Sequence, residues 1–447
     1  MRQGGLQEPV LEVTPADALI DQPRRIVVHG LRAGEHVTLT AQTTRGRGVV
    51  WASQAVFAAD GDGTVDLGRD APLSGSYAGV GPMGLLWSQC PLDVPSRELF
   101  HADTTEPLRT QLVAEAGGGE ARAELVQRLA ASGVTRQELR EDGLVGSLYL
   151  PPGPGPHPAV MILNGSGGGI NEPRAALYAS HGYAALALAY FKAPGLSDYI
   201  SNTPLEYFER GLRWMHARLR PAHGFVALSG QSRGGELVLL LGATFPELVS
   251  AVVGYVPGAV VHSAQNAADP AIGREGAAWL LGGKPLPHLW EHNRTATWAP
   301  YDEGPAPHRH ERAILTALQD PDAVERARIA VERIRGPVML LSGTDDGSWP
   351  SSLYSRMVAE RLAAHGHPHE VAHLDFAAAG HAILFPYVPT TQMVYAHPVS
   401  GRISTTGGTP AANAAADEGS WSGVHAFLVR AVAAKAAAAS SSTRRPA

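Results

Sequence analysis

Short apolar segments broken by turn residues occupy the first hundred positions of the chain. Gly, Asp and Pro separate these segments, and none of them has the periodicity of a long helix. Short strands at regular spacing are typical of an antiparallel β-sandwich. The segments expected to be strands are 11–13, 25–29, 36–42, 49–52, 56–59 and 64–67. We therefore expect an all-β, immunoglobulin-like sandwich domain over residues 9–135.

A connecting helix is expected at the end of this domain. Three glycines, 117–119, precede residues 120–132, in which Ala121, Leu125 and Leu129 recur at every fourth position. Apolar residues at that spacing lie on one face of an amphipathic helix. This helix would link the sandwich to the rest of the chain.

From about residue 136 the pattern changes to continuous apolar runs that alternate with helical segments. The runs, which have the composition of strands buried on both faces, are 158–164, 183–190, 225–229, 251–256 and 337–342. The helical segments are 205–219, 234–245 and 352–364. Strands and helices in alternation form a mostly parallel sheet with crossover helices. Residues 136–435 are therefore expected to form an α/β domain.

Two long irregular segments interrupt the α/β pattern. Residues 258–335 contain Trp279, Trp290 and Trp298 among prolines and histidines, and residues 386–418 are rich in Gly, Thr and Ala. Long irregular segments within a compact domain usually cover a functional site or are disordered. We expect the first of them to cover the site.

Composition narrows the class of protein. A chain of 447 residues with 44% hydrophobic and 17% charged residues is globular and holds more than one domain. The net charge of −6 offers no broad basic surface, so nucleic acid is not an expected partner. No apolar run has the length of a membrane span or a signal peptide, so we expect a cytoplasmic protein. The low-complexity residues 436–447 are expected to be a disordered tail.

Cysteine and lysine are both rare. Cys90 is the only cysteine, which excludes an internal disulfide and a cysteine-rich metal site. We expect it to be a small buried hydrophobic residue. The strong preference for arginine over lysine, with abundant Ala and Gly, suggests a bacterial genome rich in G and C. That bias carries no information about chemistry.

A candidate nucleophile lies in the sequence Gly230-Gln-Ser232-Arg-Gly234. This is the G-x-S-x-G pattern of a nucleophile elbow, in which glycines let a strand turn sharply into a helix and expose the serine hydroxyl. The five residues alone are a weak indication because Gly and Ser are abundant in this chain. Their position between an apolar run and an apolar helix strengthens the assignment. A glycine-rich turn without catalysis is the alternative.

Candidates for a base and an acid follow later in the chain. A serine hydroxyl becomes a nucleophile when a histidine takes its proton and an acid orients that histidine. In this fold the order is serine, acid, histidine. Asp345 and Asp346 directly follow an apolar run; either could be the acid, and the other could close an Asx turn. His381 follows a glycine after the expected strand 370–375, which completes a candidate triad with Ser232.

Acyl transfer also needs hydrogen-bond donors for the oxyanion that forms on the reacting carbonyl. Gly165, Ser166, Gly167 and Gly168 follow the first buried run of the α/β region and supply several backbone N–H groups. The N–H of Arg233, directly after the candidate nucleophile, would complete the oxyanion hole. The glycines could instead hold a phosphate, but they lack the G-x-G-x-x-G spacing and the Lys-Ser/Thr of a P-loop.

A group of histidines offers a metal site as an alternative function. His365, His367, His369 and His373 are closely spaced, but Glu370 is the only carboxylate near them at ligand spacing. A solvated turn explains the group more simply. We therefore expect neither a metal nor a cofactor.

With these features in place, the chain resembles the family of acyl-CoA thioesterases and bile-acid-CoA:amino-acid N-acyltransferases over nearly its whole length. The segments that carry the resemblance are 26–34, 75–79, 82–87, 165–170, 187–190, 205–208, 232–236, Asp345-Asp346 with Trp349, and Gly380-His381 with Pro386-Tyr387 and Pro389. The last two groups are the more specific, because they carry the acid and the base with their flanks.

The resemblance implies a β-sandwich followed by an α/β-hydrolase domain. It also implies that Ser232, Asp346 and His381 are the triad, because the family's acid lies three residues before the tryptophan, here Trp349. Family members with cysteine at the nucleophile position are amino-acid acyltransferases, whereas those with serine are mainly hydrolases. The implied function is cleavage of an acyl thioester, with acyl-CoA as the expected substrate, through an acyl-enzyme. The alternatives are an acyltransferase with an amine or alcohol acceptor, a carboxylic-ester hydrolase and, outside the enzymes, a catalytically silent binding module.

Overall fold

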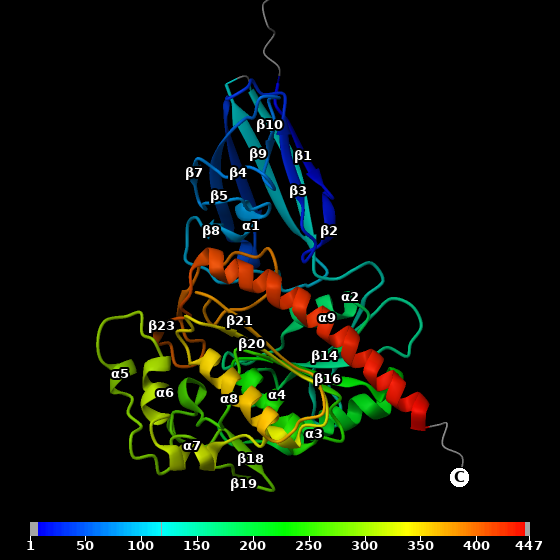
Figure 1. The fold of residues 1–447 in the computed structure, drawn as a ribbon, viewed down its shortest axis with the longest axis vertical. Helices are drawn as coiled ribbons and strands as arrows, with labels where there is room; N and C mark the ends of the chain where they lie inside the picture. Colours follow the sequence, from blue (N-terminus) through cyan, green and yellow to red (C-terminus); the bar gives the residue numbers. More distant parts are fainter. Residues whose placement is uncertain (1–7, 118, 443–447) are drawn as a thin grey trace, which may run out of the picture. The chain divides into compact units, whose positions relative to one another are not determined.

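The computed structural model describes residues 8–117 and 119–442 of the chain (Figure 1). These residues pack as two compact units. The first unit contains the described residues up to Ala131 together with 384–392 and 409–421. The second contains 132–383, 393–408 and the chain from Ser422. The boundary expected from the sequence, between 135 and 136, did not include the two later segments of the first unit.

Two β-sheets form the first unit. One sheet pairs β1 (Val10–Thr14), β3 (Arg25–His29) and β6 (Val65–Asp66). The other has the order β2 (Asp17–Leu19), β10 (Gly119–Arg128), β9 (Leu108–Ala116), β4 (His36–Thr44), β5 (Val50–Ala58) and β7 (Ser74–Gly75), with β8 (Cys90–Pro91) also paired to β5 and α1 (Gly84–Trp87) beside it. Val28, Leu39, Phe57 and Leu112 belong to one shared core. The expected β-sandwich is confirmed, and the two strands expected at 49–52 and 56–59 are the single strand β5.

The connecting helix expected at 120–132 is wrong, because most of that segment is strand β10. It pairs antiparallel with β9, where Ala121 lies opposite Ala114 and Ala123 lies opposite Leu112. Residues four apart share a face in a strand as well as in a helix, since four is a multiple of the strand period of two. The spacing that suggests a helix therefore fits a strand equally well. Pairing with β9 is what makes this segment a strand.

An eight-stranded sheet forms the centre of the second unit. Its order is β11 (Thr135–Leu139), β12 (Val145–Leu150), β14 (Ala184–Ala189), β13 (Ala159–Leu163), β16 (Val226–Gln231), β17 (Ala251–Tyr255), β20 (Val338–Gly343) and β21 (Val371–Phe376). The strands from β14 to β21 are parallel, whereas β12 pairs antiparallel with both of its neighbours. The sequence-based expectation of a mostly parallel α/β-hydrolase sheet is confirmed.

Helices connect the parallel strands. They are α2 (Glu172–Ser180), α3 (Leu205–Trp214), α4 (Arg233–Thr244) and α8 (Ser351–Ala364), and a π-helical turn, Met215–Leu219, extends α3 (Figure 1). Because the strands are parallel, the loops at their carboxyl ends meet along one edge of the sheet, where α/β proteins place their sites. The loops that follow β13, β16, β20 and β21 contain all the candidate catalytic residues.

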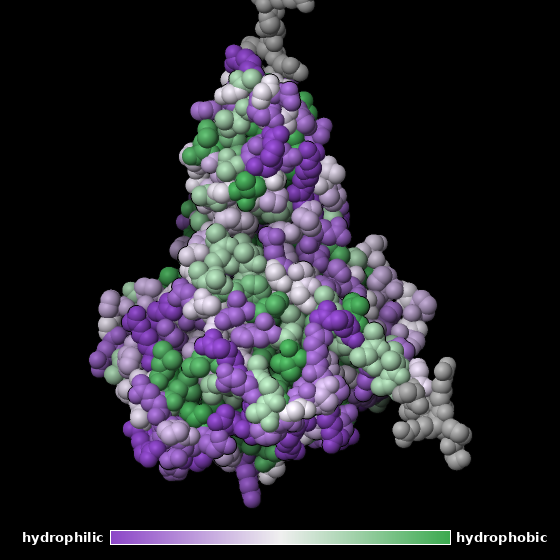
Figure 2. Space-filling model, viewed as in Figure 1, coloured by the Kyte–Doolittle hydropathy of each residue, from purple (hydrophilic) through white to green (hydrophobic). Residues whose placement is uncertain are grey.

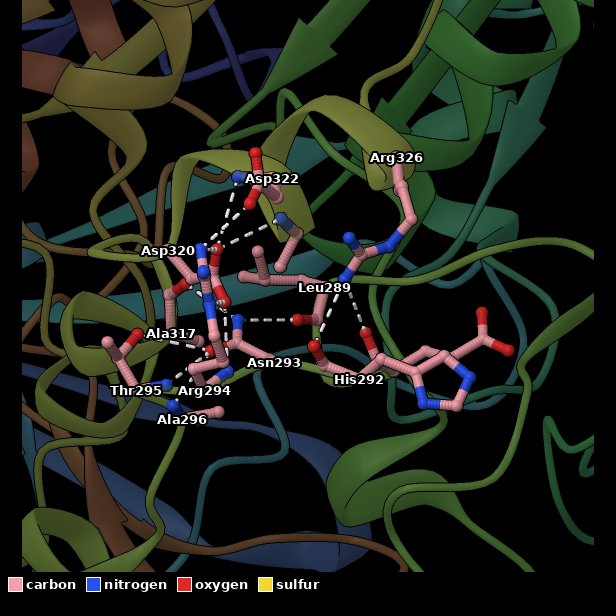
Figure 3. A network of polar contacts seen from close by, with 12 residues as sticks. Leu289, His292, Asn293, Arg294, Thr295, Ala296, Ala317, Asp320, Asp322 and Arg326 are labelled. Carbon is pink, nitrogen blue, oxygen red and sulfur yellow. Dashed lines mark hydrogen bonds and ion pairs between the residues drawn. The ribbon is translucent and has the colours of Figure 1, made fainter.

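The insertion at 258–335 has secondary structure of its own. It contains β18 (Trp279–Leu281), β19 (Lys284–Pro285), α5 (Ala299–Asp302), α6 (Glu311–Ala317) and α7 (Pro321–Ala327). A polar network joins the segment before α5 to the end of α6 and the start of α7 (Figure 3). Arg294 binds the carboxylates of Asp320 and Asp322 at 2.7 and 2.9 Å, and the Asn293 amide donates to the carbonyl of Ala317 at 2.8 Å. The insertion is therefore an ordered part of the second unit.

The end of the described chain is a hairpin followed by a long helix. Strands β22 (Val394–Ala396) and β23 (Ile403–Thr405) pair antiparallel, and α9 runs from Pro410 to Ser442. The disordered tail expected at 436–447 is therefore wrong for 436–442, which are helical; residues 443–447 lie outside the described residues. Alanine has the highest helix propensity, so the low-complexity run of alanines continues the helix.

The surface corrects one further expectation. Cys90 is exposed rather than buried, at the sheet edge where β8 pairs with β5. Figure 2 shows hydrophilic and hydrophobic side chains interspersed over the face in view. Within residues 8–117 and 119–442, no helix combines the length and the hydropathy needed to cross a membrane.

Candidate active site

Ser232 lies at the sharp turn between β16 and α4. Its backbone has φ 58° and ψ −119°, a region that non-glycine residues rarely adopt. The Ser232 N–H donates to the carbonyl of Tyr255 on the neighbouring strand β17 at 2.9 Å, and the Glu236 N–H donates to the Ser232 carbonyl at 3.0 Å. These two hydrogen bonds hold the strained residue in place. Strain of this kind is typical of functional sites because the surrounding structure must maintain it.

The glycines of the G-x-S-x-G sequence are required by close contacts with neighbouring backbone. A Cβ atom on Gly234 would lie 2.3 Å from the carbonyl oxygen of Leu163, and one on Gly230 would lie 2.1 Å from the carbonyl oxygen of Gly234. Neither distance is possible for a real side chain. Gly234 therefore lets the start of α4 pack directly against the end of β13, and Gly230 lets β16 turn tightly into α4.

His381 links Ser232 to Asp346. Its Nε2 lies 2.7 Å from the Ser232 Oγ, and its Nδ1 lies 2.8 Å from the Asp346 Oδ2. The second Asp346 oxygen accepts the backbone N–H groups of Ser348 and Trp349 at 2.8 and 3.2 Å. A carboxylate can only accept, so His381 donates from Nδ1 and its Nε2 is free to accept the serine proton. This tautomer is the one that a general base requires.

Asp345, the other acid that the sequence allowed, points to different partners. Its Oδ1 pairs with Arg309 at 3.0 Å, and its Oδ2 accepts the N–H of Gly408 at 3.0 Å. The structure therefore brings His381 to Asp346 and uses Asp345 to fasten the neighbouring segments.

Residues 406 and 407 contact both the turn that contains Asp346 and the turn that contains His381. The carbonyl of Thr406 accepts the N–H of His381 at 2.8 Å and the N–H of Gly347 at 2.9 Å. A Cβ on Gly380 would lie only 2.2 Å from the carbonyl oxygen of Gly407. This close packing explains why a glycine precedes His381, and it helps to hold His381 and Asp346 at a fixed distance.

The insertion reaches the same place through residues 309–311. Arg309 donates to the backbone carbonyl of Asp346 at 3.1 Å, and the Glu311 N–H donates to the Gly347 carbonyl at 3.3 Å. His310 lies between them and is buried, stacked 5.7 Å from the ring of Trp298. Burial lowers the pKa of His310 well below its ordinary value, so its ring is neutral at physiological pH.

Trp290, Trp298 and Trp279 of the insertion are all buried. Trp290 stacks on Trp298 with ring centroids 4.2 Å apart, and Trp279 donates from its indole to Glu236 at 2.8 Å. That the insertion covers an acyl-binding site stays a prediction, and the contacts at 309–311 are what favour it.

The candidate oxyanion donors differ in their surroundings. Arg233 is the first residue of α4, so its N–H lies at the positive end of the helix dipole. In the loop after β13, the Gly165 N–H donates to the Asn164 side chain at 3.0 Å and the Gly168 N–H donates to the Gly165 carbonyl at 3.1 Å.

The remaining N–H groups of the loop, on Ser166 and Gly167, have no hydrogen-bond partner in the described part of the chain. The loop lies against Ser232, since a Cβ on Gly165 would be 3.3 Å from the Ser232 Cβ. Of the four loop residues named from the sequence, Ser166 and Gly167 are the ones whose N–H groups are free, and they directly follow Gly165, the residue that approaches Ser232.

A buried ionic cluster begins at Arg233, the residue directly after Ser232. The Arg233 side chain binds the Glu236 carboxylate at 3.0 Å and the carbonyl of Ser263 at 2.8 Å. Glu236 also accepts a hydrogen bond from His262 Nδ1 at 2.7 Å, and Tyr354 donates to His262 Nε2 at 2.8 Å. The cluster joins the start of α4 to the insertion and to α8.

The charge states within this cluster follow from burial and pairing. Burial by itself would raise the pKa of Glu236, but the charge of Arg233 and the hydrogen bond from His262 bring that pKa below its ordinary value. Burial lowers the pKa of His262. The cluster therefore holds one ion pair and a neutral histidine, which leaves no unbalanced charge beneath Ser232.

Sequence reasoning missed Glu236, His262 and His397. Glu236 is a carboxylate at the start of the apolar helix 234–245, and such an interruption could have marked a buried partner for a nearby cation. His397 lies 2.9 Å by its Nε2 from the Ser166 Oγ, although it follows Ser166 by more than two hundred residues. No local pattern distinguishes it among 19 histidines.

The histidines considered as metal ligands are used differently. His367 Nε2 lies 3.0 Å from the carbonyl of Gly336, and His365 Nδ1 lies 2.9 Å from the carbonyl of Arg361. Among residues 8–117 and 119–442, these histidines do not belong to any set of three or more ligand atoms close enough to share an ion.

Two family models match the chain. The model described as "Acyl-CoA thioester hydrolase/BAAT N-terminal region" matches residues 21–141, and "BAAT / Acyl-CoA thioester hydrolase C terminal" matches residues 203–434. The second match alone spans more than half of the chain.

Similar proteins of known name agree with these matches. Acyl-coenzyme A thioesterase 6 of Mus musculus is 32% identical over 94% of this chain and 96% of the mouse protein. Acyl-coenzyme A thioesterase 1 of Homo sapiens is 32% identical over 91% of this chain and 93% of the human protein. Among solved structures, the carboxylesterase EstE1 superposes with a TM-score of 0.36 and 17% identity over 56% of this chain and 81% of EstE1, a likeness too distant to support a functional inference.

Proposed function

The chain belongs to the acyl-CoA thioester hydrolase/BAAT family, and from that premise we propose that it hydrolyses acyl-CoA through a Ser232–His381–Asp346 triad. The observation that carries this proposal is the position of the His381 ring, with one nitrogen 2.7 Å from the Ser232 hydroxyl and the other 2.8 Å from the Asp346 carboxylate. This arrangement activates a serine for attack on a carbonyl carbon.

In the proposed acylation step, the Ser232 proton moves to His381 Nε2 as Oγ bonds to the thioester carbonyl carbon. The carbonyl electron pair moves to oxygen, and the resulting oxyanion is stabilised by N–H groups of Arg233, Ser166 and Gly167. When the tetrahedral intermediate collapses, the carbon–sulfur bond breaks and His381 gives its proton to the departing thiol. Asp346 keeps the imidazole in the correct tautomer throughout.

In the proposed deacylation step, water replaces the thiol. His381 takes a proton from the water as the water oxygen bonds to the acyl carbon. The same oxyanion donors stabilise the second tetrahedral intermediate. The bond from the acyl carbon to Ser232 Oγ then breaks, and His381 returns the proton to the serine. The products are a free carboxylic acid and the regenerated enzyme.

The test is release of free thiol by the purified protein from acyl-CoAs of increasing chain length, with the products identified by mass spectrometry. We expect free acid as the product, and we expect millimolar glycine or taurine to change neither rate nor product. An N-acyl amino acid as the main product would make the protein a transferase. Failure to release thiol and failure to react with a fluorophosphonate probe would together indicate a catalytically silent binding module.

Ser232→Ala should abolish turnover, typically by several orders of magnitude in kcat, while the protein stays folded. His381→Ala should cost nearly as much, because members of a triad act as a unit. His367→Ala is the matched control, since it removes a histidine whose partner, Gly336, precedes strand β20 at the opposite end of the sheet. Wild-type rates in either active-site variant would contradict the assignment.

A cytoplasmic location of the protein stays a prediction from the sequence. Fractionation of the native cells would test it.

A further inference from the structure

The Ser166 side chain is held by a histidine that is distant in the sequence. Ser166 Oγ lies 2.9 Å from Nε2 of His397, which is only 4% exposed. His397 belongs to the hairpin segment between β22 and β23, and Ser166 belongs to the candidate oxyanion loop after β13. The pair therefore ties the loop beside Ser232 to the hairpin that directly precedes residues 406 and 407, which contact the turns of Asp346 and His381.

The direction of this hydrogen bond follows from the other contacts of His397. Its Nδ1 accepts backbone N–H groups of Val399 and Ser400 at 3.2 and 3.3 Å, so that nitrogen carries no proton. The proton of the neutral ring must then be on Nε2, which donates to the Ser166 hydroxyl. Burial, together with the nearby cations Lys192 and Arg233, lowers the pKa of His397 to about 4, so the ring is neutral at physiological pH.

The loop is also enclosed on its other side. The Gly169 N–H donates to the carbonyl of Phe191 at 3.0 Å, and a Cβ on Gly168 would lie 2.7 Å from the Cβ of Lys192. The Lys192 ammonium donates to the carbonyl of Pro398 at 2.6 Å, directly after His397. Residues 191–192 and 397–398 thus enclose a glycine-rich segment that would otherwise have large conformational freedom.

Such a segment needs external support if it is to stabilise an oxyanion. Glycine loses more backbone entropy on ordering than any other residue. Hydrogen-bond donors stabilise a transition state most when they are already oriented before the reaction begins. The Asn164 side chain contacts the loop at Gly165 and Gly168. Within Gly165-Ser166-Gly167-Gly168 itself only Ser166 has a side chain, so it is the residue of the loop through which a more distant side chain can orient these N–H groups.

We propose that His397 is a positioning residue for catalysis, which holds the Ser166 hydroxyl so that the backbone N–H groups of Ser166 and Gly167 face the oxyanion. This inference rests on the proposed function, because it assumes attack by Ser232 on a carbonyl carbon. It adds a residue that no sequence motif contains. His397 itself does not contact the reacting atoms.

The experiment compares Ser166→Ala, His397→Ala, His397→Gln and the double variant Ser166→Ala/His397→Ala. We expect Ser166→Ala and His397→Ala each to lower kcat about 10- to 100-fold, below the loss known for complete removal of an oxyanion donor. The KM should stay within about twofold, because the loop acts on the transition state and not on the bound substrate. Affinity for an acyl trifluoromethyl ketone, which forms a tetrahedral adduct with the serine, should fall by the same factor as kcat.

Two comparisons separate positioning from a merely structural role. The glutamine amide can reach as far as His Nε2 and can donate to Ser166, so His397→Gln should recover a large part of kcat. The double variant should be no slower than the slower single variant, because both changes remove the same hydrogen bond. The control is again His367→Ala, for which we expect wild-type kcat.

Unchanged kcat in Ser166→Ala would overturn the inference. Because Ser166→Ala removes only a single hydroxyl, it should fold, and its result decides the matter even if His397→Ala does not fold. A rise in KM alone, or losses that multiply in the double variant, would also overturn it. Ser232→Ala in the same assays distinguishes this result from failure of the proposed function. If Ser232→Ala retains activity, the proposed function is wrong; if it is inactive while Ser166→Ala is normal, only the role of His397 is wrong.

Discussion

Both units bury an arginine completely, but only one of them gives it a counter-charge. Arg45 of the sandwich has neutral partners, the Gln89 side-chain oxygen at 2.9 Å and the Leu99 carbonyl at 3.2 Å. In the described chain no carboxylate pairs with Arg45, and burial alone lowers its pKa to about 9. Arg233 of the α/β unit has the Glu236 carboxylate at 3.0 Å. The first arrangement tolerates a buried charge, whereas the second balances it with another.

The difference follows from what each arginine connects. The Gln89 amide, which accepts from Arg45, also donates to the hydroxyl of Thr43, and that hydroxyl bonds to Thr110 on the neighbouring strand. This network therefore fastens a loop to the sheet. Arg233 directly follows Ser232, and its partner Glu236 lies one turn further along the same helix. In the proposed mechanism an oxyanion forms beside Ser232, and an unbalanced charge on Arg233 would change the electrostatic field around it. We infer that buried polar groups stabilise the fold in the first unit and also prepare the site in the second.

The largest expected effect tests whether a buried charge of the second unit acts in the chemistry. Asp346→Asn should lower kcat by about 10⁴-fold, because the amide favours the wrong tautomer of His381. Asp345→Asn should lower kcat by less than about tenfold, since Asp345 bonds to Arg309 and Gly408 instead. Steady-state kinetics on both variants, with circular dichroism to verify the fold, would decide. The opposite ranking would assign the role to Asp345.

The next effect compares the two buried arginine sites directly. Glu236→Gln should destabilise the protein by about 3 to 5 kcal/mol, because it leaves the Arg233 charge buried without a counter-charge. It should also lower kcat. Arg45→Met should cost about 1 to 3 kcal/mol, because Gln89 and Leu99 lose a buried donor, and kcat should not change. Urea unfolding and kcat would be measured on the same preparations; a loss of kcat in Arg45→Met would contradict the comparison.

A smaller effect concerns the pH dependence of stability, to which the buried His397 of the second unit should contribute. The folded-state pKa of His397 is about 4, below its ordinary value of 6.5, so between these values the unfolded protein binds a proton that the folded protein does not. The free energy of unfolding should therefore fall as the pH is lowered from 6.5 to 4, with His397 contributing up to about 3 kcal/mol. Urea unfolding of wild type and His397→Gln across this range would measure it. Equal slopes for the two proteins would show that His397 does not contribute.

The smallest expected effect compares a buried tryptophan from each unit. Trp290→Phe should shift kcat/KM gradually among acyl chain lengths, because apolar pockets discriminate by only about 1 to 3 kcal/mol per methylene. Trp51 of the sandwich, which is fully buried, provides the control. Trp51→Phe should lower stability without changing the order of preference among chain lengths. A uniform loss on all substrates in Trp290→Phe would mean that Trp290 is part of the core only.

The sequence predicted features that depend on neighbouring residues and missed those that depend on distant ones. The turn at Ser232 was predictable because a glycine-flanked serine between a strand and a helix is a local pattern. Strand β10 was mistaken for a helix because a spacing of four fits both structures, and only pairing with β9 distinguishes them. His397 was not predictable, since its role depends on contact with a loop from another part of the chain. The helical end of α9 was missed because an alanine-rich segment is both simple in composition and strongly helical.

The first unit is built from three separate segments of the chain, which has a consequence for its folding during translation. Tyr387 belongs to the sandwich core, and its carbonyl accepts a hydrogen bond from Gln127 at 3.2 Å, while the Thr390 N–H donates to the carbonyl of Trp87 at 3.0 Å. During translation the amino-terminal strands emerge from the ribosome long before residues 384–392 and 409–421 are synthesised. The sandwich cannot complete its core until nearly all of the catalytic unit has been produced. Expression of the first 131 residues alone would therefore yield a domain that lacks part of its core.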